Sequence, residues 1–214
     1  MSVNYIQRTV SVTGVGRVTA ATDLLALNLA VETQAVTASD ALAENNKQAA
    51  AVLSALKDHG IQERDIQTTQ LSIDPVLARQ DPNDTQPPKI IGYRVRNGLN
   101  VTVRDVSAAG AVIDAIVHAG GDAIRIEGIS FSFADPARLL AEARKRAIAD
   151  ARDRAQQLTG GLGVELGNVI SISESDPSGG PAPRVHAFAA AAVVLPGESE
   201  ITLSVTVDYE ISTK

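Results

Sequence analysis

The sequence predicts an α+β protein with a mostly antiparallel sheet of long strands, on which two shorter helices and one long helix pack. Residues 200–212 alternate strictly between apolar and polar side chains, which is typical of a strand with one wet face. Residues 136–158 repeat apolar side chains at steps of three and four, as a long amphipathic helix does. Two shorter helical patterns, at 39–59 and 107–119, each end at glycine. This combination favours an antiparallel α+β arrangement over a doubly wound one.

The first two strands are expected at 9–14 and 23–36, separated by a Gly-Val-Gly sequence. A dinucleotide-binding fingerprint would need a third glycine, where this chain has Thr19, and a helix directly afterwards. The residues that follow are strand-like instead. We therefore predict that Gly14 and Gly16 form a hairpin turn or bulge and bind no nucleotide.

The helix at 39–59 has Ser39 as its expected N-cap and Gly60 as its stop. Its apolar stripe is Leu42, Ala49, Val52, Leu53 and Leu56. The helix at 107–119 ends at Gly120 and Gly121, and its inward residues are Val112, Ile113, Ile116 and Val117. His59 and His118 both lie in the last turn of a helix, where positive charge is favoured, so a structural role is expected for each.

Two strands are expected at 65–77 and 90–104, with a loop at 79–89 that is rich in Pro, Asn and Asp. The second strand points Ile91, Tyr93, Val95, Leu99, Val101 and Val103 one way. Arg94, Arg96 and Arg104 lie on its other face. They are interpreted first as exposed charges that discourage edge pairing. The alternative is a small-molecule or anion binding face.

The strand at 123–133 changes its apolar parity, which predicts a bulge at Gly128. It leads into the long helix, capped by Asp135 with Pro136 in the first turn and expected to stop at 160–161. The predicted buried stripe is Leu140, Ala143, Ala147, Ala151, Ala155 and Leu158. Two ion pairs are expected along the exposed side, Glu142 with Arg146 and Asp150 with Arg154.

After the long helix come a strand at 164–173 and a second loop at 174–184. The segment 185–195 is apolar but has neither helical nor strand periodicity. An exposed apolar segment usually marks an interface, so we predict a contact between subunits, with an internal strand over the core as the alternative. The expected interface residues are Val185, Phe188, Val193, Val194 and Leu195. In 200–212 the residues expected to be buried are Ile201, Leu203, Val205, Val207, Tyr209 and Ile211.

Composition argues against several classes of function. Aromatic residues make up only 3% of the 214 residues and the net charge is −6, which argues against nucleic-acid binding. The chain has no cysteine and no recognisable catalytic or metal-binding motif. We therefore expect no catalytic residue, no metal and no cofactor.

The N-terminal residues MSVNYIQRTV show no basic region followed by an apolar core, and no stretch of about 18 apolar residues occurs. As written, the chain is expected to be cytoplasmic and to lack a membrane span. A periplasmic or cell-envelope location is expected instead if the native protein begins with a leader that this sequence lacks.

Several strings in this order resemble the SIMPL-domain family, a domain of unknown function that includes periplasmic immunogenic antigens. They are VSVTGVGRV, IIGYRVRNGLNVTVRDV, GISFSFADP, RAIADARDRAQQL, GLGVELGNVISISE and LPGESEITLSVTVDYEI. The resemblance covers nearly the whole chain and predicts a single domain at 8–213. It implies a non-enzymatic bacterial envelope protein linked to stress tolerance, and a homo-oligomer. The family has no defined catalytic residues to carry over.

Overall fold

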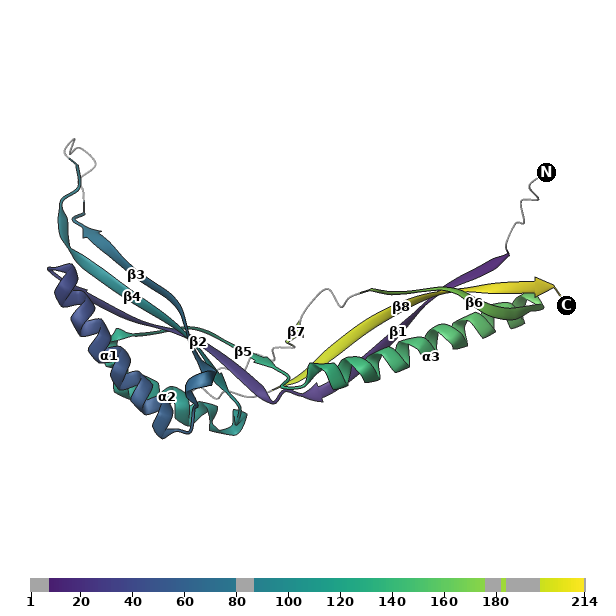
Figure 1. The fold of residues 1–214 in the computed structure, drawn as a ribbon, viewed down its shortest axis with the longest axis horizontal. Helices are drawn as coiled ribbons and strands as arrows, with labels where there is room; N and C mark the ends of the chain where they lie inside the picture. The colour runs from purple at the N-terminus through teal and green to yellow at the C-terminus, as the bar shows by residue number, and fades with distance from the viewer. Residues whose placement is uncertain (1–7, 80–86, 176–181, 184–196, 214) are drawn as a thin grey trace. The chain divides into compact units, whose positions relative to one another are not determined.

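The computed structural model describes residues 8–79, 87–175, 182–183 and 197–213. The α+β class is confirmed, and the strands form two four-stranded antiparallel sheets, of order β1-β8-β6 with β7 on β8, and β3-β4-β2-β5 (Figure 1). The strands are β1 (Thr9–Ala21), β2 (Leu24–Ala35), β3 (Ile66–Leu77), β4 (Ile90–Val103), β5 (Ile124–Ser132), β6 (Val164–Ser175), β7 (Ala182–Pro183) and β8 (Glu198–Thr213). The helices are α1 (Ala38–Asp58), α2 (Ala109–Gly120) and α3 (Pro136–Leu162), with 3₁₀ turns η1 (Glu63–Asp65), η2 (Val106–Ala108) and η3 (Gly121–Ala123).

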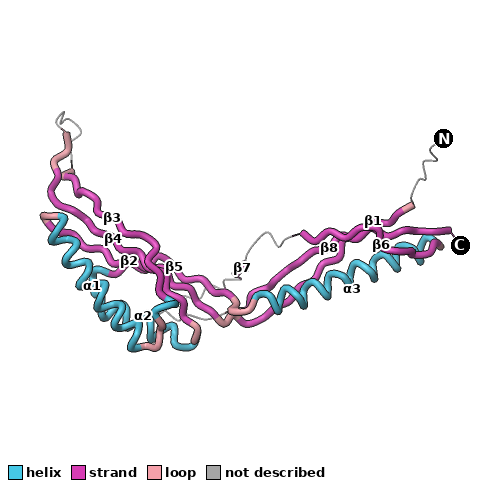
Figure 2. Tube along the Cα trace, viewed as in Figure 1, coloured by secondary structure: helices cyan, strands magenta, loops and turns pink. Residues whose placement is uncertain are grey.

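The chain divides into two compact units. Unit 1 contains β1, α3, β6, β7 and β8, and unit 2 contains β2 to β5 with α1 and α2. Within each unit the helices cover one face of the sheet (Figure 2). The range of the single domain expected at 8–213 includes both units, and the single domain stays a prediction.

In unit 1, α3 packs through a stripe of small residues. Asp135 caps the helix and Pro136 opens it, as predicted. The buried residues are Leu139, Ala143, Ala147, Ala151, Ala155 and Thr159. Of the predicted ends of the stripe, Leu140 is half-buried and packs against this core, whereas Leu158 is wrong because it is 49% exposed. Successive steps of four residues rotate slowly around the helix, which lets the stripe follow a twisted sheet. The helix also runs past 160–161 to the left-handed cap Gly163, at φ 68°.

The turn or bulge expected at Gly14 and Gly16 is wrong, because both glycines lie inside the continuous strand β1. A Cβ on Gly14 would lie 2.1 Å from the carbonyl oxygen of Ala147, and one on Gly16 would lie 1.8 Å from that of Ala143. The glycines therefore let the alanine stripe of α3 approach the sheet backbone. The close packing of α3 on β1 explains the Gly-Val-Gly sequence, and no bound phosphate is needed to account for it.

In unit 2, α1 and α2 cover a core that includes Leu25, Leu27, Leu29, Val52, Leu56, Val101, Val112 and Ile116. The N-cap of α1 is Thr37, whose Oγ1 accepts a hydrogen bond from the Asp40 backbone N at 3.1 Å; the predicted Ser39 lies in the first turn instead. Val117, expected inward, is 46% exposed because it lies on the outer side of α2.

The remaining strand predictions agree with the structure except in detail. The pairing of β2 with β5 slips between Asn28 and Leu29, opposite Gly128, which confirms the bulge. Burial alternates along β8, although Ile211, near its end, is only half-buried. The loop predicted at 174–184 is wrong at 174–175, which belong to β6, and at 182–183, which form β7 on β8; its other residues lie outside the described part. Of the loop at 79–89, residues 80–86 lie outside the described part.

Candidate functional site

The open face of the unit 2 sheet carries a cluster of charged side chains around Glu32. Leu27, Leu29 and Val31 of β2 point into the core, so alternation turns Glu32 to the opposite face. Glu32 lies directly opposite Arg96 of β4 in the strand register. The pairing of β2 with β4 therefore brings this carboxylate and this guanidinium together.

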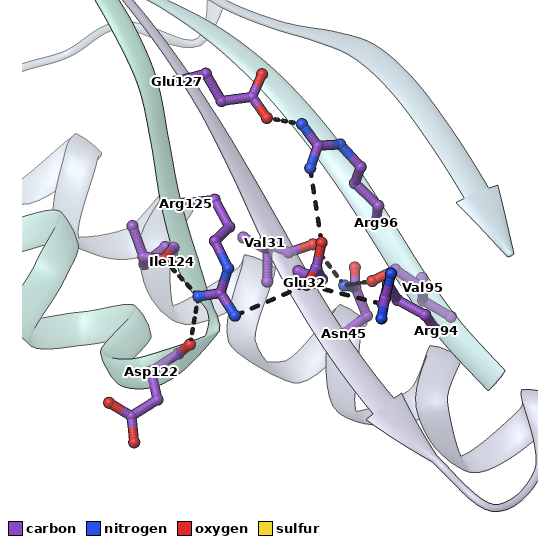
Figure 3. Close-up of polar contacts among 10 residues, drawn as sticks. All are labelled: Val31, Glu32, Asn45, Arg94, Val95, Arg96, Asp122, Ile124, Arg125 and Glu127. Carbon is purple, nitrogen blue, oxygen red and sulfur yellow. Dashed lines mark hydrogen bonds and ion pairs between the residues drawn. The ribbon is translucent and has the colours of Figure 1, made fainter. Parts of the chain in front are cut away.

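Three guanidinium groups surround the single Glu32 carboxylate (Figure 3). The distances from its oxygens are 3.9 Å to Arg94 Nε, 3.6 Å to Arg96 Nη1 and 3.7 Å to Arg125 Nη2. All three distances exceed hydrogen-bond length, so these contacts are ion pairs without a hydrogen bond. The Glu32 side chain is 22% exposed, which leaves the carboxylate shielded beneath the arginines.

Two of these arginines are held by further partners. Arg96 Nη2 forms an ion pair with Glu127, the extra residue of the β5 bulge. Arg125 Nη1 donates hydrogen bonds to the backbone oxygens of Asp122, at 2.7 Å, and Ile124, at 2.9 Å. The bulge thus gives β5 an additional side chain over the cluster, and the arginine positions are set by the protein.

The charges of this face nearly cancel. Three arginines and two glutamates would leave one positive charge, but Asp74 of β3 lies opposite Arg94 in the register and shares its face. The charged cluster, defined as Glu32, Asp74, Arg94, Arg96, Arg125 and Glu127, is then neutral overall. A balanced surface of both signs suits recognition of a complementary protein surface better than capture of a free anion.

A buried amide supports the strands that carry the cluster. Asn45 of α1 donates through Nδ2 to the backbone oxygens of Val31, at 2.9 Å, and Val95, at 3.4 Å. Its Oδ1 has no hydrogen-bond partner among the described residues. Asn45 therefore ties α1 to β2 and β4 immediately beneath Glu32 and Arg96 (Figure 3).

Arg104, the third arginine of the predicted anion-binding face, lies outside the charged cluster. Arg104 is about 33 Å along β4 from Arg94, at about 3.3 Å per residue, and its guanidinium pairs with Asp65. The cluster instead contains Arg125, Glu32 and Glu127, which the sequence analysis did not single out. The alternating pattern of β2 indicates an outward Glu32, but only the pairing of β5 shows that Arg125 joins it. Anion binding by Arg94, Arg96 and Arg104 stays a prediction.

A second surface in unit 2 is apolar. Five large side chains of the paired strands β3 and β4 are each 45% or more exposed, and we call them the apolar strip: Leu71, Ile73, Leu77, Ile90 and Ile91. Such a gathering on neighbouring strands usually marks a contact surface. The interface predicted at Val185, Phe188, Val193, Val194 and Leu195 lies outside the described residues.

The histidines are placed as expected for helix ends: His59 is the C-cap of α1 and His118 lies in the last turn of α2. Within the described ranges, no group of three His, Asp or Glu side chains could hold a metal ion. No helix in the described part of the chain is long and apolar enough to cross a bilayer.

Comparison with known proteins adds the family. A family model described as SIMPL, protein of unknown function (DUF541), matches residues 10–209. The chain belongs to the SIMPL family. It is 36% identical to the 26 kDa periplasmic immunogenic protein of Brucella melitensis, over 94% of this chain and 84% of that protein. It is 29% identical to the uncharacterized protein YggE of Edwardsiella ictaluri, over 83% of this chain and 72% of that one.

The Escherichia coli K12 protein YggE, also uncharacterized, is 29% identical over 81% of this SIMPL chain and 68% of its own length. The SIMPL family match spans both compact units. The family is described as one of unknown function, and none of these three relatives is named as an enzyme.

Proposed function

We propose that this SIMPL protein is a non-enzymatic protein of the bacterial cell envelope that works by self-assembly. The observation that carries the proposal is the apolar strip, where Leu71 is 58% exposed and Leu77, further along β3, is 50% exposed. Burying these side chains against a second copy would remove apolar surface from water, which stabilises association. The name of the Brucella relative supports the proposed periplasmic location, and the family resemblance alone supports a link to stress tolerance.

Two copies are expected to associate through the side chains of the strip and not by pairing the edges of their sheets. Pro75 lies in the edge strand β3 between Ile73 and Leu77, and proline cannot donate a backbone hydrogen bond to an added strand. Contact through the side chains of the strip is therefore favoured over extension of the sheet. The charged cluster does not take part in this contact. Asp74 directly follows Ile73 in β3, so the cluster lies on the opposite face of these strands.

The test is the assembled mass of the full chain, measured by size-exclusion chromatography with light scattering. The double variant Leu71→Lys with Leu77→Lys should fold, with unchanged circular dichroism, and have a smaller mass than the wild type. Gln67→Lys is the matched control, because Gln67 is an exposed polar residue of the same strand. A wild-type protein that is monomeric at all concentrations, or a double variant that keeps the full mass, would contradict the proposal.

The interface predicted at 185–195 is tested separately. Replacing these residues by a Gly/Ser linker of equal length should yield a folded protein of smaller assembled mass. A variant that unfolds would favour the alternative, an internal strand over the core. A variant with the full mass would leave the apolar strip as the proposed contact surface.

A further inference from the structure

A cavity of about 230 Å³ lies within unit 2, away from the charged cluster and the apolar strip. It is formed where the end of α1 and the following η1 turn meet the end of β4 and the start of α2. The polar side chains in its lining belong to His59, Gln62, Asp65, Thr102, Arg104 and Asp105. The lining therefore comes from segments separated in sequence and joined by the fold.

The cavity has an apolar part as well. Ile61, Val103 and Val112 contribute to its lining, and each is buried in the unit 2 core. These three side chains form an apolar wall beside the polar groups, and such a mixture suits a small molecule that carries both polar and aliphatic groups. The wall could accept an aliphatic side chain, while the polar groups would set the orientation of a ligand.

Arg104 is held in place by Asp65. Its Nε donates to Asp65 Oδ1 and Oδ2, at 3.2 and 3.0 Å, and its Nη2 donates to Oδ1 at 2.7 Å. The Asp65 side chain is only 6% exposed, whereas that of Arg104 is 55% exposed. Among the described residues nothing accepts from Nη1, so this nitrogen keeps two N–H donors for a ligand. A guanidinium fixed in this way is prepared to bind a carboxylate.

Acceptors lie in the same lining. His59 Nδ1 is 3.0 Å from the Ala55 carbonyl oxygen, and because a carbonyl only accepts, Nδ1 must carry the proton. With the proton on Nδ1, Nε2 of an uncharged ring is an acceptor. Asp105 Oδ1 accepts from the backbone N of Ser107, at 3.1 Å, and from its Oγ, at 2.5 Å, which leaves Oδ2 as a further acceptor.

The charges decide what kind of ligand fits. Arg104 and Asp65 cancel one another, and Asp105 adds one negative charge, so a lone anion would enter an unfavourable site. A ligand that pairs a carboxylate with an ammonium group meets both signs. We propose that this cavity binds a small aliphatic α-amino acid, with its carboxylate on Arg104 Nη1, its ammonium group near Asp105 and His59 Nε2, and its side chain on the apolar wall. The site is independent of the self-assembly proposed above.

The test uses L-valine as the probe, titrated into the full chain and followed by the backbone amide signals in NMR spectra. Saturable shifts are expected at 59–65 and 102–112, with a Kd of about 1 mM or below. Two analogues of L-valine test the two charged contacts separately: isovalerate lacks the ammonium group, and isobutylamine lacks the carboxylate. Each should bind at least about tenfold more weakly, since one charged contact is lost.

Ala108→Phe is the blocking variant, because Ala108 lines the cavity without contacting the Asp65–Arg104 pair. It should abolish the L-valine shifts. Ala111→Phe places the same side chain on the exposed side of α2 and should bind as the wild type does. Arg104→Lys keeps the charge but loses the planar fork, and should weaken binding at least about tenfold.

The proposal is overturned if L-valine gives no saturable shifts, if isovalerate binds as tightly as L-valine, or if folded Ala108→Phe binds normally. None of these results depends on the assembled mass. Failure of the ligand site is thus distinguishable from failure of self-assembly.

Discussion

The carboxylate of Asp150 on α3 accepts a hydrogen bond from the backbone N of Val15, its Oδ2 lying 2.8 Å away. Val15 belongs to β1, an edge strand of the unit 1 sheet. Four residues earlier on the helix, Arg146 Nη1 donates to the backbone oxygen of Arg17 at 2.7 Å. Side chains of α3 thus occupy an N–H and a C=O group of this edge, which hinders the addition of another strand.

Removing the Asp150 carboxylate should destabilise unit 1. Asp150→Ala leaves the Val15 N–H without its acceptor and should lower the free energy of unfolding by about 1–3 kcal/mol. Asp153→Ala is the control, because Asp153 lies on the exposed side of the same helix and, within the described ranges, accepts a hydrogen bond only from Gln157, one turn away. It should change stability by less than about 0.5 kcal/mol. Urea unfolding followed by circular dichroism measures both, and equal losses would contradict the role given to Asp150.

The same contact should make stability depend on pH in the acid range. The hydrogen bond from Val15, together with Arg154 and Arg17, holds the pKa of Asp150 below its usual value, against the opposing effect of burial. A lowered folded-state pKa means that the stabilisation is complete above the unfolded value of about 3.9 and is lost as the pH falls through the folded value. The stability difference between wild type and Asp150→Asn should therefore shrink below about pH 3.9. A difference that is constant from pH 7 to pH 2.5 would rule this out, on the scale of about 1.4 kcal/mol per pKa unit.

The glycines of β1 should tolerate no side chain. Gly16→Ala should cost about 3 kcal/mol or more, because the new methyl group would overlap the Ala143 backbone, which cannot rotate away. Gly160→Ala makes the same chemical change in the last turns of α3, where the added methyl group meets nothing within 4 Å. It should be neutral or stabilising by up to about 1 kcal/mol. Thermal unfolding compares them, and a harmless Gly16→Ala would show that α3 is not packed closely on β1.

The two faces of β8 should respond differently to truncation. Val205 is 1% exposed, so Val205→Ala removes packed methyl groups and should cost about 1–3 kcal/mol. Its neighbour Ser204 lies on the outer face, half-buried, and Ser204→Ala should stay within about 0.5 kcal/mol of the wild type. The midpoints of denaturant unfolding, compared between variants with equal m-values, test both substitutions. Similar losses at both positions would mean that the register of β8 is not the one described.

The charged cluster should contribute little to stability despite its many ion pairs. The three arginine contacts of Glu32 are each longer than 3.5 Å, and the arginine side chains are between 33% and 49% exposed. Solvent screens such pairs, so Glu32→Gln should lower the free energy of unfolding by no more than about 1 kcal/mol. Chemical unfolding in low and high salt checks this. A much larger loss would assign the cluster to the fold rather than to a surface available for binding.

The sequence by itself determined the types of the elements and most of their faces. The alternation of β8, the alanine steps of α3 and the parity change at Gly128 are local patterns, and side-chain period alone reveals them. Errors occurred where a local signal has two meanings. Ser39 and Thr37 are both capable caps, and only backbone geometry selects Thr37.

The tertiary structure alone decided which distant residues meet. The division of the strands between two sheets depends on pairings such as β1 with β8, whose residues lie nearly the whole chain apart. The role of Gly14 and Gly16 required the position of α3, and the gathering of Arg125 with Glu32 and Arg96 required the order β4-β2-β5. These contacts arise from strand register and helix packing between separate segments, and no short-range periodicity encodes them.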